Sequence, residues 1–388
     1  MMKIRLLVAA AVCAASLCLP ALAACSQDTY IEYTLYNSED EAVETLRVAP
    51  DPYSAEETEQ DVQTPDIGEG SYFIVTGFSG KPSDVVIPAE LYGAPVRGVA
   101  EQAFIQCRYL QSVTIEEGVE YTGGAAFAFC RALVQASLPS TLDTAYSTFA
   151  YCTALKTVTI AEGFAAVGDR DFYACSALES VNGTEECAIN LPSTLTAIEQ
   201  NAFYGCSSLA GGLTVPAGVT EIEGTVFAAC SGITLVRLLG EVTSIGYASF
   251  SGCSAMTEIT LPDSVTSVGD GAFSYCTSLE SIVLPAGVGF LGASAFEGSS
   301  VSSVSVPAGK GAWLYTQKLA EDDPETEENE AVLPGTDGAE EWLFDYSYND
   351  EYSSRGYLPS AELADGAGAA EYLKGDCLAA YWYFVTPQ

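Results

Sequence analysis

The sequence lacks histidine altogether, and its 388 residues include only 14 lysines and arginines against 52 aspartates and glutamates. Without an imidazole, the chain cannot form a Ser-His or Cys-His nucleophile pair or a histidine-ligated metal site. A formal net charge of −38 at pH 7 repels phosphate backbones and anionic lipid headgroups. These absences exclude histidine-dependent catalysis, and they argue against a nucleic-acid partner and against electrostatic docking to a membrane.

The N-terminus has the pattern of an export signal. Lys3 and Arg5 precede an apolar run over residues 6–19 that is too short to span a bilayer comfortably. The tetrapeptide Leu22-Ala23-Ala24-Cys25 resembles a bacterial lipobox, in which the cysteine is alkylated with diacylglycerol. We therefore expect a lipoprotein signal peptide over residues 1–24 and a lipid anchor on Cys25, at the extracellular face of the bacterial membrane. The alternative is cleavage after Ala23, which would secrete a soluble protein.

One pattern recurs from about residue 84 to residue 306, and ITLPDSVTSVGDGAFSYCTSL (residues 259–279) is one copy. It contains a phenylalanine with successive spacings of 23, 22, 23, 31, 24, 23, 23 and 23 residues. The column is Phe104, Phe127, Phe149, Phe172, Phe203, Phe227, Phe250, Phe273 and Phe296. Three residues after the first eight comes a cysteine: Cys107, Cys130, Cys152, Cys175, Cys206, Cys230, Cys253 and Cys276. The ninth copy has Ser299 instead.

A period near 23 residues falls in the range of leucine-rich repeats, in which each unit contributes one short strand and a turn. A single unit cannot bury its own phenylalanine and aliphatic side chains, so units stack and their strands pair in parallel. The alternation in Ile282-Val283-Leu284 places Ile282 and Leu284 inward and Val283 outward. The sequence thus predicts a β-rich solenoid of about nine 22–24-residue coils over residues 71–310, flanked by acidic, less ordered segments.

The phrase SYFIVTGFSGKPSDVVIPAELYGAPVRGVAEQAF around Tyr72 and the recurring LPxxVTxIGxxAFxxCxxL are similar to the BspA-type leucine-rich repeats of bacterial surface proteins. The resemblance covers residues 71–310, and it is interrupted by an insertion near Val181 to Ile189 that lengthens this repeat by 8 residues. It implies an extracellular solenoid that binds a ligand or mediates adhesion, and it implies no catalytic residue.

The eight repeat cysteines are expected to form a structural ladder of small, buried, weakly polar side chains. Disulfides between neighbouring coils are disfavoured, because parallel Cα–Cβ vectors do not give the required dihedral angle. Zinc is disfavoured as well, since one cysteine every 23 residues on a single column does not surround an ion. Cys187 and Cys377 lie outside the column, and their state is left open. We expect no cofactor.

The outward strand position of each coil is the candidate binding face. It is mostly hydroxylated, with one cation, and consists of Thr114, Ser137, Thr159, Asn190, Thr214, Arg237, Thr260, Val283 and Ser305. Threonine in such a column is also simply a good residue for an exposed strand. As a binding face, the row offers regularly spaced hydrogen-bonding groups to an extracellular protein or glycan.

Two acidic segments flank the repeats. Residues 25–70 are expected to be a stalk, with one strand at 30–36, and residues 311–388 a C-terminal cap with an acidic, aromatic-rich tail. Trp313 and Leu314 could close the last coil. Two functions remain open: a monomeric, surface-displayed binding or adhesion module, or an exported enzyme whose activity resides in residues 311–388, with the repeats as a spacer.

The lipid anchor is testable by mass spectrometry of the mature protein. We expect Cys25 to be the N-terminal residue and to carry diacylglycerol, because two acyl chains, at about 0.8 kcal/mol per buried methylene, hold a protein on a bilayer. An unmodified Cys25 thiol on mature protein would contradict the lipoprotein interpretation.

Overall fold

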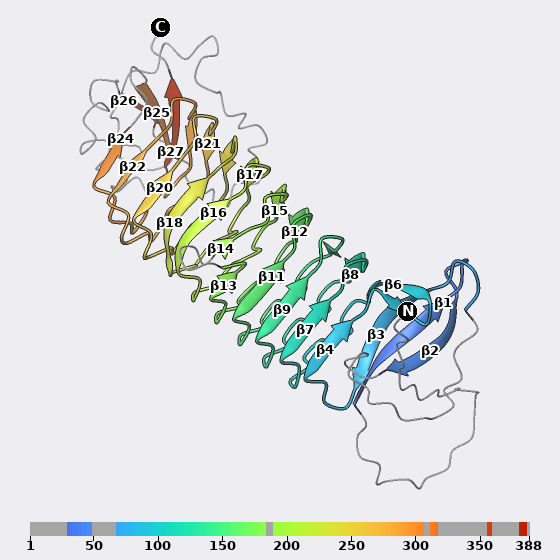
Figure 1. Ribbon diagram of the computed structural model, residues 1–388. Coiled ribbons are helices and arrows are strands. Elements are labelled where there is room, and N and C mark those ends of the chain that lie inside the picture. Colours follow the sequence, from blue (N-terminus) through green and yellow to red (C-terminus); the bar gives the residue numbers. More distant parts are fainter. Residues whose placement is uncertain are drawn as a thin grey trace, which may run out of the picture. The chain divides into compact units, whose positions relative to one another are not determined.

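Strands and turns, with no helix, make up the part of the chain that the computed structural model describes (Figure 1). That part comprises residues 29–48, 67–183, 189–305, 311–316, 355–358 and 380–385. The chain divides into two units, Met1–Leu209 and Ala210–Gln388, which are described one after the other. Both are built from the repeat, with five of the nine repeat phenylalanines in the first unit and four in the second.

The first unit begins with a folded sheet where the sequence predicted a stalk. Strand β1 (Tyr30–Tyr36) pairs antiparallel with β2 (Ala42–Val48) and with β3 (Tyr72–Ser79). The apolar side chains that alternate along β1 are buried. On its other side, β3 pairs in parallel with β6 (Ala94–Val99). Residues 29–48 therefore differ from the expected stalk: they cover the apolar end that a solenoid would otherwise expose.

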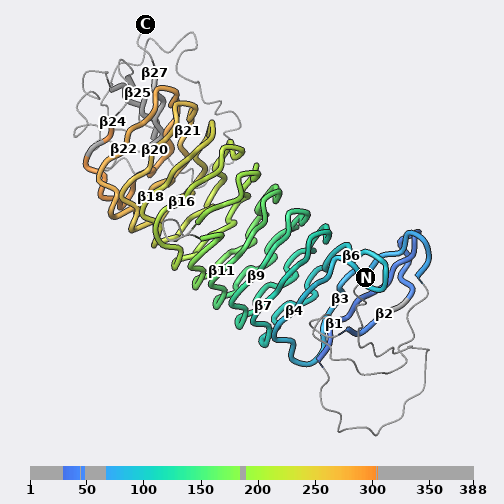
Figure 2. The backbone as a smooth tube through the Cα atoms, in the orientation of Figure 1, coloured from blue at the N-terminus to red at the C-terminus, as the bar shows by residue number. Residues whose placement is uncertain are grey.

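The coils of the first unit have two walls of short parallel strands (Figure 2). The longer strands form the first wall, in the order β4 (Asp84–Ile87), β7 (Ser112–Ile115), β9 (Gln135–Leu138), β11 (Thr157–Ile160), β13 (Ser180–Val181) and β14 (Ile189–Asn190). We call this the strand wall. The second wall contains β6, β8 (Tyr121–Thr122), β10 (Asp143–Thr144), β12 (Ala166–Val167) and β15 (Ala197–Ile198), with β5 (Glu90–Leu91) paired antiparallel to β6.

The second unit repeats this plan. Its strand wall contains β16 (Gly211–Val215), β18 (Ile233–Leu238), β20 (Glu258–Thr260), β22 (Ser281–Val283) and β24 (Ser303–Ser305). The opposite wall contains β17 (Glu221–Ile222), β19 (Ser244–Ile245), β21 (Ser267–Val268) and β23 (Phe290–Leu291). The glycine that follows β21 is required by the close approach of the coils, because a Cβ on Gly269 would lie 2.7 Å from the amide nitrogen of Tyr247.

Three C-terminal strands extend the opposite wall of the second unit. Strand β27 (Ala380–Val385) lies between β23 and β25 (Gly311–Thr316) and pairs antiparallel with both, and β26 (Arg355–Leu358) pairs with β25. The last repeat strand of this wall is thus covered by another strand. An end that pairs with a returning segment no longer presents free backbone groups to other chains.

Stacked phenylalanine rings form the centre of each unit. Consecutive ring centroids are 4.9–5.8 Å apart, with interplanar angles of 2–15°. No repeat phenylalanine is more than 1% exposed. These centroid distances lie in the range of about 4.5–7 Å that is favourable for stacked aromatic pairs, and the strand register, which repeats at about 4.8 Å, sets the spacing of the rings. The stack and the parallel walls confirm the predicted β-rich solenoid of leucine-rich repeats.

The insertion in the first unit does not break the parallel strand pairing of the strand wall. Val181 pairs with Ile189 across the inserted residues. Asn182 then takes the place of a neighbouring strand: its Nδ2 donates to the carbonyl oxygen of Ile160, and its Oδ1 accepts from the Ile160 amide, both at 2.8 Å. One side chain thus pairs with both backbone groups of Ile160, so neither group is left without a hydrogen bond.

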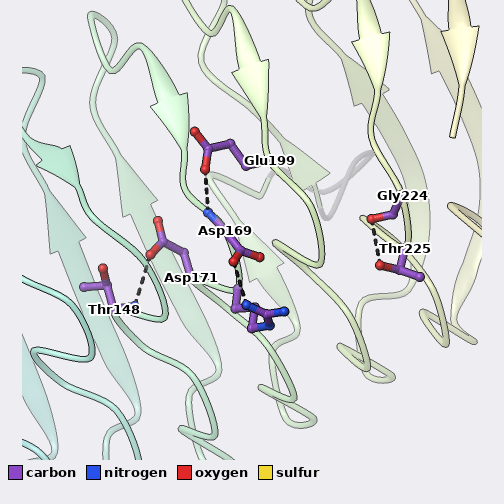
Figure 3. Close-up of polar contacts among 7 residues, drawn as sticks. Thr148, Asp169, Asp171, Glu199, Gly224 and Thr225 are labelled. Atoms are coloured by element: carbon purple, nitrogen blue, oxygen red, sulfur yellow. Dashed lines mark hydrogen bonds and ion pairs between the residues drawn. The ribbon is translucent and has the colours of Figure 1, made fainter. Parts of the chain in front are cut away.

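A carboxyl group is buried in the mostly apolar core of the first unit (Figure 3). Asp171 is 2% exposed and occupies the position before Phe172, where most other copies have alanine. Its Oδ1 accepts from the amide of Thr148 at 3.1 Å, and its Oδ2 accepts from the amide of Gly168 at 2.8 Å. Burial raises the pKa of the Asp171 carboxyl, and these hydrogen bonds offset part of the rise.

The phenylalanine stack can be tested with Phe127→Ala. Removing a ring that is packed on both faces leaves a cavity, and we expect the free energy of unfolding to fall by about 3–5 kcal/mol. Urea denaturation followed by circular dichroism measures the change. Thr159→Ala, on the exposed side of β11, is the control and should change stability by less than about 0.5 kcal/mol. Similar effects of the two substitutions would contradict a shared stacked core.

The buried carboxyl predicts a pH dependence with a definite sign. Because the folded-state pKa of Asp171 is raised, the folded protein binds its proton more tightly than the unfolded chain. Wild-type stability relative to Asp171→Asn should therefore be greatest below the unfolded pKa of about 3.9 and should fall as the pH rises toward the folded pKa. Urea unfolding of both proteins between pH 4 and pH 7 checks this. A difference that stays constant with pH, or grows in favour of the wild type, would refute it.

Candidate functional site

The strand wall of the first unit presents a row of polar side chains to solvent. Thr114 pairs with Ser137, and Ser137 pairs with Thr159, on adjacent parallel strands. Thr114 and Thr159 are exposed, and Ser137 is half-buried. Within the described part of the chain, these three hydroxyls make no side-chain hydrogen bond, so they are available to a ligand. Asn190 is exposed on β14 and belongs to the same wall.

In the second unit, the same position forms a row with a cation at its centre. Arg237 on β18 pairs in register with Thr214 on β16 and with Thr260 on β20. Arg237 is exposed, and among the described residues 210–305 it is the one lysine or arginine. No ion pair or hydrogen bond of its guanidinium occurs within the described ranges. The row therefore combines five unpaired N–H donors with flanking hydroxyls.

The remaining members of the predicted face are less polar or lie outside the description. Val283 on β22 is 66% exposed, as the alternation predicted, and the neighbouring Ile282 and Leu284 are buried. Ser305 pairs with Val283 through the backbone of β24, but its side chain lies outside the described residues. The polar part of the face in the second unit is thus the row Thr214, Arg237 and Thr260.

The repeat cysteines point inward and link neighbouring coils. All eight are buried free thiols. In six of them the Sγ donates to the carbonyl oxygen of the repeat phenylalanine in the preceding coil, at 3.1–3.3 Å; these are Cys130, Cys152, Cys175, Cys206, Cys253 and Cys276. The described residues contain no cluster of three or more metal-ligating groups. The structure therefore places these cysteines in a hydrogen-bonded packing column.

Burial also suppresses the reactivity of these thiols. It raises the pKa of Cys175 and of Cys276 to about 12, and it raises the pKa of Cys152 and Cys253 as well. Only the thiolate is nucleophilic, and only the protonated thiol can donate to a carbonyl. The column therefore serves the interior of the solenoid and offers no catalytic nucleophile.

A third wall, made of turns around each repeat phenylalanine, was missed by the sequence analysis. The residues two before and two after the phenylalanine have φ values between +47° and +74°, as at Ala125 and Phe129 around Phe127. Their amides donate to the next coil, from Ala125 to Tyr146 at 2.9 Å and from Phe129 to Ala150 at 2.8 Å. We call this the turn wall. Its sequence signal is weak, because only some copies use glycine there.

The turn wall of the first unit carries an aromatic ladder that the sequence analysis also missed. Phe129 stacks on Tyr151 at 4.7 Å, Tyr151 meets Tyr173 at 5.3 Å with the rings tilted by 57°, and Tyr173 stacks on Tyr204 at 4.8 Å. Tyr151 is 38% exposed, and the others are half-buried. The detectable signal is an aromatic residue one or two positions after the repeat phenylalanine.

Several predictions fall on residues outside the described ranges. These are the lipid-modified Cys25, the two off-column cysteines Cys187 and Cys377, and most of residues 311–388, in which the alternative enzyme activity was placed. Within the described residues, no helix is long and apolar enough to cross a membrane.

Comparison with known structures finds leucine-rich repeat proteins of bacteria. A leucine-rich repeat protein of T. pallidum is 28% identical and is matched over 48% of this chain and 83% of its own, with a TM-score of 0.43. The pneumococcal vaccine antigen PcpA is 18% identical over 59% of this chain and 63% of its own, with a TM-score of 0.37. A leucine-rich repeat protein of Bacteroides ovatus is 25% identical over 63% and 86%, with a TM-score of 0.25. A search of curated proteins finds no significant match.

Comparison with protein families gives a match to the BspA-type leucine-rich repeat region, in 6 copies, over residues 86–188 and 186–303. The two matches together span more than half of the 388 residues. They contain the phenylalanine column, the cysteine column and both strand-wall rows described above. The chain therefore belongs to the BspA-type leucine-rich repeat family.

Proposed function

We propose that this protein is a binding module displayed on the bacterial cell surface, which holds an extracellular protein or glycan against its strand wall. The lipobox-like Cys25 would provide the anchor, and the repeats would provide the binding surface. The observation that carries the proposal is the row Thr214, Arg237 and Thr260, in which Arg237 and Thr260 are exposed and Thr214 is half-buried. The polar side-chain groups of this row have no partner among the described residues.

The chemistry of this row suits recognition better than catalysis. A guanidinium presents a planar set of donors that pairs with carboxylate, sulfate or carbonyl oxygens, and a hydroxyl on each side can donate or accept. Each such hydrogen bond contributes about 0.5–1.5 kcal/mol, so useful affinity requires several coils to act together. A solenoid meets that requirement, because it repeats the same position on adjacent strands.

The described residues supply little for an enzyme. The eight repeat thiols are buried, and histidine is absent from the whole chain. The buried carboxyl of Asp171 already accepts two backbone hydrogen bonds inside the core. These groups maintain the fold, so a partner would meet the outer surface of the coils, to which the strand wall belongs.

The proposal is tested by screening the full mature chain against matrix-protein and glycan arrays. We expect at least one ligand to bind, and we expect the triple variant Thr214→Ala, Arg237→Ala, Thr260→Ala to weaken that binding by tenfold or more. Arg170→Ala is the matched control, since it removes an exposed arginine from the turn wall, where Arg170 pairs with Asp169 at 2.7 Å. If the triple variant binds as tightly as the wild type, the strand-wall row is not the site.

A further inference from the structure

Four cations gather along one edge of the first unit, where the turn wall meets the strand wall. They are Lys81, Arg108, Arg131 and Lys156, all exposed, and we call them the basic edge. Backbone hydrogen bonds hold the coils in register here: Gln111 donates to Ser83 at 2.6 Å, Val134 to Gln111 at 2.7 Å and Lys156 to Val134 at 2.7 Å. The edge contains four of the 14 lysines and arginines of the chain.

Two arginines at the centre of this edge lie side by side. Arg108 directly follows Cys107, and Arg131 directly follows Cys130, at the same position of adjacent coils. The thiol of Cys130 donates to Phe104 at 3.1 Å, which fixes the offset between the two coils. Neither guanidinium has an ion pair in the described part of the chain. Both arginines lie in turns, and none of the described acidic residues pairs with either of them, although the chain has 52 acidic residues.

Apolar surface accompanies the charges. Lys81 Nζ lies 5.3 Å from the centroid of the Tyr109 ring, and Tyr109 is 41% exposed. Val134, three residues after Arg131, is 38% exposed. Among the described residues, Lys156 is the one member of the edge with an ion pair, to Glu179 at 3.0 Å. Tyrosine and arginine are enriched among the residues that contribute most of the binding energy in protein interfaces, and here they surround a small apolar centre.

We propose that the basic edge is a docking site for a protein partner that presents a carboxylate-rich segment. This rests on the proposed function as a binding module, and it adds a second surface and the chemistry of its partner. Arginine forks pair with carboxylates in a bidentate manner, and two adjacent forks select two adjacent acidic side chains. The −38 charge of the chain does not prevent this, because charges beyond about 8 Å are screened at physiological salt.

The ring geometry favours a protein over a glycan. Sugars stack on the open faces of aromatic rings, and Lys81 lies over one face of Tyr109. In the aromatic ladder of the turn wall, Phe129 and Tyr151 stack at 4.7 Å, so each ring closes one face of the other to a sugar. A tyrosine combines an apolar ring with a polar hydroxyl, which suits the mixed apolar and polar contacts that a protein surface makes.

The test uses the full mature chain and a fluorescein-labelled deca-glutamate peptide, with fluorescence anisotropy as the readout. We expect saturable binding that weakens as salt is raised. The double variant Arg108→Gln, Arg131→Gln should lose at least tenfold in affinity, because both guanidinium forks are removed. Arg170→Gln is the matched control: it removes an exposed arginine of the same unit that is already paired with Asp169 at 2.7 Å, and it should bind the peptide like the wild type. Thermal melts followed by circular dichroism should show all three proteins folded.

Three outcomes would overturn this inference. Equal peptide binding by the double variant would show that the arginines are not the site. Binding of a heparin oligosaccharide through Arg108 and Arg131, without binding of the peptide, would assign the edge to anionic glycans. A concentration-dependent dimer that the double variant loses would make a second copy of the chain the occupant. Array ligands lost only in the strand-wall triple variant would leave the proposed function intact in each of these cases.

Discussion

The distance between adjacent β-strands controls the position of every other group in each unit. Parallel strands repeat at about 4.8 Å, and the coils that carry them must pack at the same interval. Phenylalanine meets this condition because a flat ring fills one interval, as the centroid distances of 4.9–5.8 Å show. The thiol beside it donates to the carbonyl of the preceding coil, so the same interval is held by packing and by a hydrogen bond.

The interior chemistry separates structural from functional groups. Buried thiols with raised pKa values remain protonated, and protonation is what allows them to donate to the phenylalanine carbonyls. In the ninth copy, the hydroxyl of Ser299 donates instead to Phe296 of its own coil at 2.6 Å, since serine has the shorter reach. Groups able to meet a partner are therefore confined to the outer surface of the coils.

Charge is distributed unevenly over that surface. Acidic residues outnumber basic ones by 52 to 14, which favours solubility and repulsion from anionic surfaces. Against this background, Arg237 on one strand wall and the pair Arg108 and Arg131 on one edge are local exceptions. Screening limits the reach of a charge to about 8 Å at physiological salt. These local arginines therefore decide which partner binds, whereas the net charge mainly affects how a partner approaches the protein.

The repeat period predicted the solenoid and the inward phenylalanines and cysteines, because a fixed period relates equivalent positions of successive coils. The alternation within each strand added the prediction of the outward row that includes Thr114, Thr214 and Arg237. The folding of residues 29–48 into the terminal sheet, the left-handed turns around each phenylalanine, and the buried Asp171 were decided only by the tertiary structure. A period carries no information about non-repeating ends or about distances between different positions within one coil. The distances within a coil depend on which backbone turns let every coil stack at the same spacing.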